Sequence, residues 1–288
     1  EIRNCLVGSE MCIRDSKQII EPIPASDGAG VKLKRSIGVE PNYFDPFLML
    51  DEFGSENSED YIAGFPPHPH RGIETVTYML AGDFEHKDST GGEGRMTAGD
   101  VQWMKTGSGI IHSEMPAMKE GKLHGFQLWI NMPAKLKMSK PSYIYIDADQ
   151  MQTHLDEEKI VKVIAGKFRK AEGLIKKHNV EPIYFDIELN KDKEFNFDLP
   201  STHNSFIYLI KGEIKIGNQQ HQKIENSKLI LLKMGEKLKV YGSTNAKFLL
   251  IAGKPIGEQI ARGGPFVMNT KQEILQAVED YHKGTFVK

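Results

Sequence analysis

Two short runs, His68-Pro-His70 and His112-Ser-Glu114, place side chains that can bind a metal two residues apart. In a β-strand, residues at this spacing point to the same face, so each run presents two ligands together. Three imidazoles and one carboxylate form a mixed nitrogen and oxygen ligand set. Such a set suits a divalent transition metal and is similar to the 2-His-1-carboxylate sites that leave iron positions open for oxygen. The two runs therefore indicate metal-dependent oxygen chemistry.

The chain between the two runs must bring them together, because an isolated H-x-H pair is weak evidence for metal binding. Residues 74–80 alternate as a strand does, Ala81-Gly82-Asp83 and Gly99-Asp100 indicate turns, and residues 101–104 predict another strand. Neighbouring strands of an antiparallel barrel lie about 4.8 Å apart, so the two runs could converge on one ion. This spacing fits a cupin barrel.

Further motifs resemble those of the pirin family, in order from about Val31 to the C-terminus. They are Lys34-Arg-Ser-Ile-Gly38, Phe44-Asp-Pro-Phe-Leu48, Asp51-Glu-Phe53, Phe65-Pro-Pro-His-Pro-His-Arg-Gly72, Gln102-Trp-Met104, Gly109-Ile-Ile-His-Ser-Glu-Met-Pro116, Gln127-Leu-Trp129 and Gly264-Pro-Phe-Val-Met-Asn-Thr270. The resemblance implies that the metal ligands are His68, His70, His112 and Glu114 and that the metal is iron(II). Zinc, manganese, nickel, cobalt and copper remain alternatives.

The resemblance also implies an enzyme of the quercetin 2,3-dioxygenase type, whose substrates are a flavonol, or a similar small molecule, and dioxygen. The flavonol hydroxyl coordinates the metal as its anion, and dioxygen opens the central ring with loss of carbon monoxide. Glu114 is the candidate catalytic base as well as a ligand. The residues do not select quercetin over other enol or catechol substrates.

A second hypothesis is a non-enzymatic regulator, in which the oxidation state of bound iron changes the affinity for a transcription factor or a metabolic enzyme. This hypothesis requires a partner surface near the metal. Basic residues that could form it are Lys34, Arg35, Arg71 and Arg95. A structural zinc site is disfavoured, because such sites are typically closed and often use cysteine.

Other residues near the two runs have structural interpretations. Glu74 lies where many cupins place a carboxylate ligand, but the pirin pattern favours Glu114, so we expect Glu74 to orient a ligand histidine. The remaining histidines have no partner at ligand spacing, and surface or hydrogen-bonded core positions are expected for His86, His124, His154, His178, His203, His221 and His282. Candidates for an apolar cavity mouth are Phe53, Phe65, Met79, Trp103 and Met115.

Strand patterns in both halves predict an all-β fold of two tandem cupin barrels, of the double-stranded β-helix or jelly-roll type, with a short C-terminal helix. Residues 17–147 form the expected metal-binding domain, and residues 148–288 form a metal-free cupin with strands at 206–210, 229–232 and 248–252. The lysine-rich residues 135–141 predict a solvated connector.

The predicted C-terminal helix has a capping box formed by Thr270 and Glu273, and Gly284 ends it. Its apolar stripe consists of Ile274, Leu275, Val278 and Tyr281. A stripe of this kind usually packs on a core, so we expect the helix to fold back onto a barrel.

Residues 1–16 contain both cysteines, Cys5 and Cys12, and do not resemble the pirin family. This stretch is similar to a translated sequencing adapter, so we expect a non-native or disordered tail without a role in function.

Composition limits the classes of partner. The 288 residues include 37 basic and 39 acidic side chains, and the net charge of −2 provides no general attraction for nucleic acid. The sequence has no run of about 18 apolar residues and nothing similar to a signal peptide. We therefore expect no membrane association, no direct nucleic-acid binding, and a cytoplasmic location.

Overall fold

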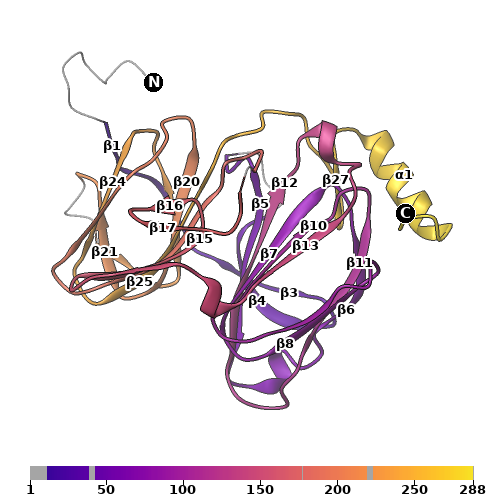
Figure 1. The fold of residues 1–288 in the computed structure, drawn as a ribbon, viewed down its shortest axis with the longest axis horizontal. Coiled ribbons are helices and arrows are strands. Elements are labelled where there is room, and N and C mark those ends of the chain that lie inside the picture. The colour runs from indigo at the N-terminus through magenta and orange to yellow at the C-terminus, as the bar shows by residue number, and fades with distance from the viewer. Residues whose placement is uncertain (1–11, 39–42, 177, 219–222, 288) are drawn as a thin grey trace. The chain divides into compact units, whose positions relative to one another are not determined.

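The structure is a computed structural model of the chain, and it describes residues 12–38, 43–176, 178–218 and 223–287. The described residues form two compact units, which Figure 1 shows as two groups of strands. The first unit contains residues 23–150 and 256–288, and the second contains residues up to 22 together with 151–255. The predicted all-β fold with one short C-terminal helix is confirmed.

The described part of the first unit has two large antiparallel sheets and one two-stranded hairpin. The larger sheet has the strand order β13 (Ser142–Ile146), β10 (Val101–Lys105), β7 (Ile73–Ala81), β12 (Leu123–Asn131), β5 (Phe47–Ser55), β4 (Val31–Ile37) and β3 (Ile23–Asp27). The smaller sheet has the order β6 (Phe65–His70), β11 (Ile110–Pro116), β8 (Phe84–Asp88) and β9 (Glu93–Met96). Apolar side chains from both sheets, such as Met79 of β7 and Phe84 of β8, share one core.

The turns predicted in this unit are present. Gly82 and Gly99 have φ angles of 89° and 97°, a conformation that glycine adopts without the steric cost of a Cβ. The predicted strands at 74–80 and 101–104 lie within β7 and β10, which pair antiparallel. Short 3₁₀ turns interrupt the unit at η2 (Ser58–Asp60), η3 (Ala134–Leu136) and η4 (Ala148–Gln150).

The second unit repeats this architecture. Its larger sheet has the order β14 (Thr153–Leu155), β15 (Lys159–Ala165), β18 (Ile183–Leu189), β25 (Ala246–Gly253), β20 (Asn204–Lys211), β23 (Lys228–Leu232) and β2 (Ser16–Ile20). The other sheet has the order β1 (Ile13–Arg14), β24 (Lys237–Gly242), β21 (Glu213–Ile216) and β22 (Ile224–Glu225), with β19 (Glu194–Asp198) also on β24. A further hairpin joins β16 (Lys167–Phe168) to β17 (Ala171–Glu172). The strands predicted in this half are all present.

The C-terminal residues differ from the predicted domain division, because residues 256–288 pack with the first unit. The hairpin of β26 (Ala261–Gly263) and β27 (Phe266–Met268) meets the chain just after β6 through an isolated bridge between Arg71 and Phe266. Helix α1 (Lys271–His282) lies beside β27 (Figure 1) and has the predicted capping box. Ile274 and Val278 of the predicted stripe pack on Phe266 and Phe286, whereas Leu275 is exposed.

The beginning of the described chain also departs from expectation. Residues 12–16 do not form a disordered tail, because Ile13 and Arg14 pair with Lys237 and Leu238 of β24. The Arg14 side chain is fully buried and donates hydrogen bonds to carbonyl and hydroxyl oxygens of the second unit. These bonds satisfy a guanidinium that would otherwise be costly to bury. Residues 1–11, including Cys5, lie outside the described residues.

The predicted connector at residues 135–141 is only partly solvated. Lys135 and Lys140 are exposed, but Lys137 is buried. Its ammonium group donates to Gly72 O, Asn131 Oδ1 and Val267 O at 2.7–2.8 Å. Three acceptors match the three N–H bonds of a lysine, which explains how this side chain can leave water.

No helix in the described part of the chain is long and apolar enough to cross a membrane.

Candidate metal centre

Strands β6 and β11 place three histidines against one another. His112 is the direct antiparallel partner of His68, and His70 pairs with Ile110. Directly opposed residues on adjacent strands point to the same face, so the three rings converge. The centroid of the His68 ring is 4.8 Å from His70 and 4.3 Å from His112, and a ligand nitrogen of each ring lies within 4.8 Å of the others. The convergence expected from the two sequence runs is therefore present for the histidines.

Backbone carbonyls orient two of these rings. His68 Nδ1 lies 2.8 Å from Pro66 O, and His70 Nδ1 lies 3.3 Å from Pro265 O. A carbonyl accepts but does not donate, so Nδ1 carries the proton in each ring and Nε2 keeps its lone pair. Histidines that bind metals commonly have their second nitrogen fixed in this way.

His112 has no such partner within the described chain. Both of its ring nitrogens are buried, and neither has a hydrogen-bond partner among the described residues. A buried donor or acceptor without a partner costs about 1–3 kcal/mol, so native proteins rarely keep one without a reason. A metal ion bound at this ring would satisfy one of the two nitrogens.

Burial keeps the imidazoles of His70 and His112 neutral. The pKa of His70 falls to about 3, mainly because its burial disfavours the charged form and because His68 lies close by. The pKa of His112 falls well below its usual value for the same reasons, burial first and then His70 and His68. A neutral imidazole offers a lone pair to a metal, so the donor set fits a divalent ion.

Glu114 is buried on the same strand face as His112, but its oxygens lie outside the cluster of three histidine nitrogens. Thr77 Oγ1 donates to Glu114 Oε1 at 2.8 Å, and Gln127 Nε2 donates to Oε2 at 2.9 Å. Both donors come from the larger sheet, β7 and β12, and fix the carboxylate from the side of that sheet. Its role as a fourth ligand stays a prediction.

Glu74 and His86, for which the sequence predicts structural roles, both form side-chain hydrogen bonds. Glu74 is buried and accepts a hydrogen bond from Trp103 Nε1 at 2.6 Å, so it anchors an indole. His86 is a hydrogen-bonded core residue, as expected, between Asp88 and Gln102. Its ring centroid is 5.4 Å from that of His112, a proximity that residue spacing alone did not reveal.

The basic residues predicted for a partner surface have different settings, and Lys34 and Arg95 keep exposed side chains, so this surface stays a prediction. Arg71 is buried, where it pairs with Asp280 and donates to Ser108 O. Arg35 pairs with Asp51, and Arg95 pairs with Asp83. These arginines are neutralised within the chain.

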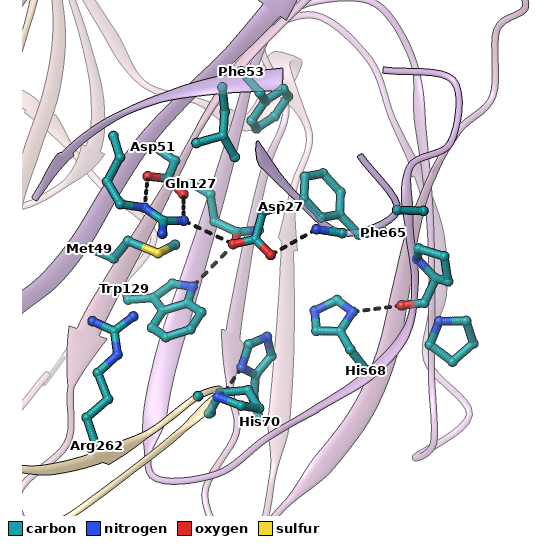
Figure 2. Close-up of a pocket in the computed structure, with 18 residues that line it drawn as sticks. Asp27, Met49, Asp51, Phe53, Phe65, His68, His70, Gln127, Trp129 and Arg262 are labelled. Carbon is teal, nitrogen blue, oxygen red and sulfur yellow. Dashed lines mark hydrogen bonds and ion pairs between the residues drawn. The ribbon is translucent and has the colours of Figure 1, made fainter. Parts of the chain in front are cut away.

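A cavity of about 530 Å³ opens beside His68 and His70 (Figure 2). Phe53 and Phe65 line it as expected, whereas Met79 and Trp103 are buried in the core and Met115 lies outside its lining. Sequence reasoning missed further lining residues, namely Asp27, Arg35, Met49, Asp51, Gln127, Trp129 and Arg262. Several of these lie within the motifs that resemble the pirin family, but their spacing gave no sign that they share a cavity.

Two tandem β-barrels, one of which holds three converging histidines beside a cavity, define the chain as a bicupin. Residues 30–130 match the family Pirin, and residues 184–287 match the Pirin C-terminal cupin domain. The chain belongs to the pirin family. The resemblance found in the sequence motifs is therefore confirmed.

Relatives are similar over nearly the whole chain. A pirin-like protein of Caulobacter vibrioides is 42% identical over 279 residues, which cover 96% of this chain and 100% of that protein. Human pirin is 39% identical over 263 residues, which cover 89% of this chain and 88% of that protein. The crystal structure of a quercetin 2,3-dioxygenase from Acinetobacter baumannii superposes with a TM-score of 0.87 at 30% identity and covers 96% of this chain and 99% of that one.

Proposed function

We propose that the chain is a metal-dependent dioxygenase of the quercetin 2,3-dioxygenase type, with the metal held by His68, His70, His112 and Glu114. The observation that carries this proposal is the buried His112 ring, whose two nitrogens have no hydrogen-bond partner among the described residues. The similarity to a quercetin 2,3-dioxygenase from Acinetobacter baumannii supports the reaction type. Iron(II) is the proposed metal.

The protein residues would perform distinct tasks. His68, His70 and His112 provide nitrogen donors, and backbone carbonyls already orient the rings of His68 and His70 before a metal binds. When bound, the metal supplies a Lewis acid and a centre for reaction with dioxygen. Thr77 and Gln127 hold the carboxylate of Glu114, which would accept the proton of the substrate hydroxyl.

The cavity suits a flat aromatic substrate. Its volume lies within the range of about 300–1,000 Å³ that is typical of sites for small molecules. Met49, Phe53, Phe65 and Trp129 provide an apolar lining for the rings of such a substrate. In the proposed reaction both atoms of dioxygen enter the products, the central ring opens, and one ring carbon leaves as carbon monoxide.

The test compares the full chain with His112→Ala after anaerobic loading with iron(II). His154→Ala is the matched control, because His154 lies in the second unit and pairs with Asp156. We expect oxygen uptake with quercetin, and a rise in unfolding temperature on metal addition, in the wild-type and control proteins only. At 100 times the Kd a metal adds about 2.7 kcal/mol to the free energy of unfolding.

The two readouts separate the metal site from the reaction. Stoichiometric metal with a stabilising effect, but without oxygen uptake or bleaching of quercetin, would contradict the proposed reaction and leave the metal site in place. If His112→Ala keeps both the oxygen uptake and the metal-dependent rise in unfolding temperature, the proposed metal site is contradicted.

A further inference from the structure

Arg262 differs from the other charged residues of the cavity in having an unused set of hydrogen-bond donors. It lies in β26, and its guanidinium carbon is 5.0 Å from the centroid of the Trp129 ring. Within the described residues, it has neither a hydrogen-bond partner nor an ion pair, and it is only partly exposed. An arginine presents five N–H donors, and this one directs none of them to an acceptor in the described part of the chain.

The neighbouring carboxylates are already engaged. Arg35 donates to both oxygens of Asp51 at 2.8 and 2.7 Å, and to Asp27 at 3.0 Å. This bidentate pair is the geometry in which arginine binds a carboxylate most strongly. Asp51 and Asp27 thus both pair with Arg35. Among the described residues, Arg262 is the arginine of the cavity lining that has no carboxylate partner.

The surroundings of Arg262 favour an added anion. Burial lowers the pKa of Arg262 first and the positive charge of Arg35 lowers it further, while the carboxylates of Asp51 and Asp27 offset only part of this, so the guanidinium carries a net cost that an anionic ligand would relieve. Trp129 holds one side of the guanidinium in place, and a fixed guanidinium loses less freedom on binding.

Trp129 also relates Arg262 to the metal centre. The centroid of its ring is 5.0 Å from that of His70, edge to face, and the same indole contacts Arg262 (Figure 2). The Trp129 ring therefore lies 5.0 Å from both the His70 ring and the Arg262 guanidinium, and connects the two along the cavity. A flat ligand along Trp129 can reach His70 at one end and Arg262 at the other.

We propose that Arg262 is a specificity-determining residue that binds an anionic oxygen group of the substrate, such as a carboxylate, distant from the oxygens that face the histidines. The substrate class is then an aromatic enol or catechol that carries an acidic group. This inference rests on the proposed function in placing the chelating oxygens at the histidines.

The test uses two probes of the same shape, 3,4-dihydroxybenzoate and 3,4-dihydroxybenzamide, in which an anionic carboxylate is exchanged for a neutral amide. Isothermal titration calorimetry measures their affinities for the full chain, metal-free and loaded with redox-inert zinc(II). We expect the wild-type protein to bind the acid about ten-fold or more tightly than the amide, because hydrogen bonds between charged groups are roughly twice as strong as neutral ones.

Variants identify the residue responsible. Arg262→Gln should remove the preference for the acid and leave the affinity for the amide unchanged, and Arg262→Lys should retain part of it, since the charge remains but the planar fork is lost. Arg95→Gln is the matched control, because Arg95 pairs with Asp83 outside the cavity and should keep the full preference.

Each outcome decides the inference. Binding of neither probe would overturn it. Equal affinity for acid and amide, or a preference that persists in Arg262→Gln, would also overturn it, even where zinc strengthens the binding of both probes as the proposed function requires. If Arg262→Gln abolishes the preference for the acid, but zinc does not strengthen the binding of either probe, the result supports the role of Arg262 and counts against chelation at the histidines.

Discussion

At the residue scale, the carboxylate of Glu114 has a defined orientation because each of its oxygens accepts one hydrogen bond. Thr77 and Gln127 provide these bonds from two adjacent strands of the larger sheet. Gln127 in turn accepts from Trp129 Nε1 at 3.3 Å. The proposed ligand, its support and the indole of the cavity therefore form one connected chain of polar contacts.

The substitution Thr77→Val tests this chain, because it keeps the shape of the side chain and removes the hydroxyl. We expect metal affinity to fall by about 10–100-fold, as is typical when the support of a metal ligand is lost. The metal-free protein should also lose about 1–3 kcal/mol of stability, since a buried carboxylate oxygen loses its donor. Competition with a chelator and urea unfolding measure the two effects.

Thr153→Val is the control for this substitution, because Thr153 is exposed on β14 in the second unit. If Thr77→Val destabilises the chain but leaves metal affinity at the control value, Glu114 does not act on the metal and the ligand set reduces to the three histidines.

At the element scale, the turn between β6 and β7 depends on Gly72. Its φ angle is 79°, and a Cβ at this position would lie 2.1 Å from Val267 O of β27. Gly72 O also accepts from Lys137. This turn therefore allows the strand that carries His68 and His70 to approach the C-terminal hairpin.

Comparison of Gly72→Ala with Gly91→Ala separates two costs. Gly91 has a similar φ of 87° but open space around it, so its alanine should lose about 1 kcal/mol from backbone strain alone. Gly72→Ala should lose clearly more, because the new methyl group meets a backbone carbonyl that cannot rotate away. Urea unfolding measures both losses of stability. Equal losses would show that β27 can move away from the new methyl group without a loss of folding free energy.

The strands were predictable and their long-range partners were not. Alternation with a period of two identifies β7 and β10, and the spacing of His68, His70 and His112 requires only that adjacent strands pair in register. The return of β26 to the first unit left no local signal, because it depends on contacts between residues nearly 200 positions apart, such as Arg71 and Phe266. For this reason Arg262 was not identified as a cavity residue.

At the scale of the whole molecule, each unit is completed by a segment from elsewhere in the chain. Strand β2 and Arg14 complete the second unit, and residues 256–288 complete the first. In the first unit, the Arg71 guanidinium lies 4.4 Å from the Phe286 ring and pairs with Asp280 of α1. The residue that follows His70 thereby fastens the C-terminal helix, so the stability of this helix and the geometry of the metal centre should be coupled.

Lys137 connects three separate parts of the first unit. Its ammonium group donates to oxygens of Gly72, Asn131 and Val267. Replacement by methionine keeps the length of the side chain and leaves these oxygens without a donor. We expect Lys137→Met to lower the free energy of unfolding by about 2 kcal/mol at pH 7. Lys135→Met is the control, since Lys135 is exposed two residues away and should change little.

The same side chain gives the stability a dependence on pH. Burial lowers the pKa of Lys137 from 10.5 to about 8 in the folded chain, so between these pH values the unfolded chain holds one proton more. Raising the pH through this window therefore favours the folded state, by about 3 kcal/mol at most. Urea unfolding at several pH values should show the wild-type protein gaining stability relative to Lys137→Met between about pH 8 and 10.5, with no relative change between pH 6 and 7. No relative change between pH 8 and 10.5, with a relative loss of stability that begins only above about pH 10.5, would mean that the three acceptors stabilise the ammonium more than burial penalises it, and that the folded pKa lies above 10.5.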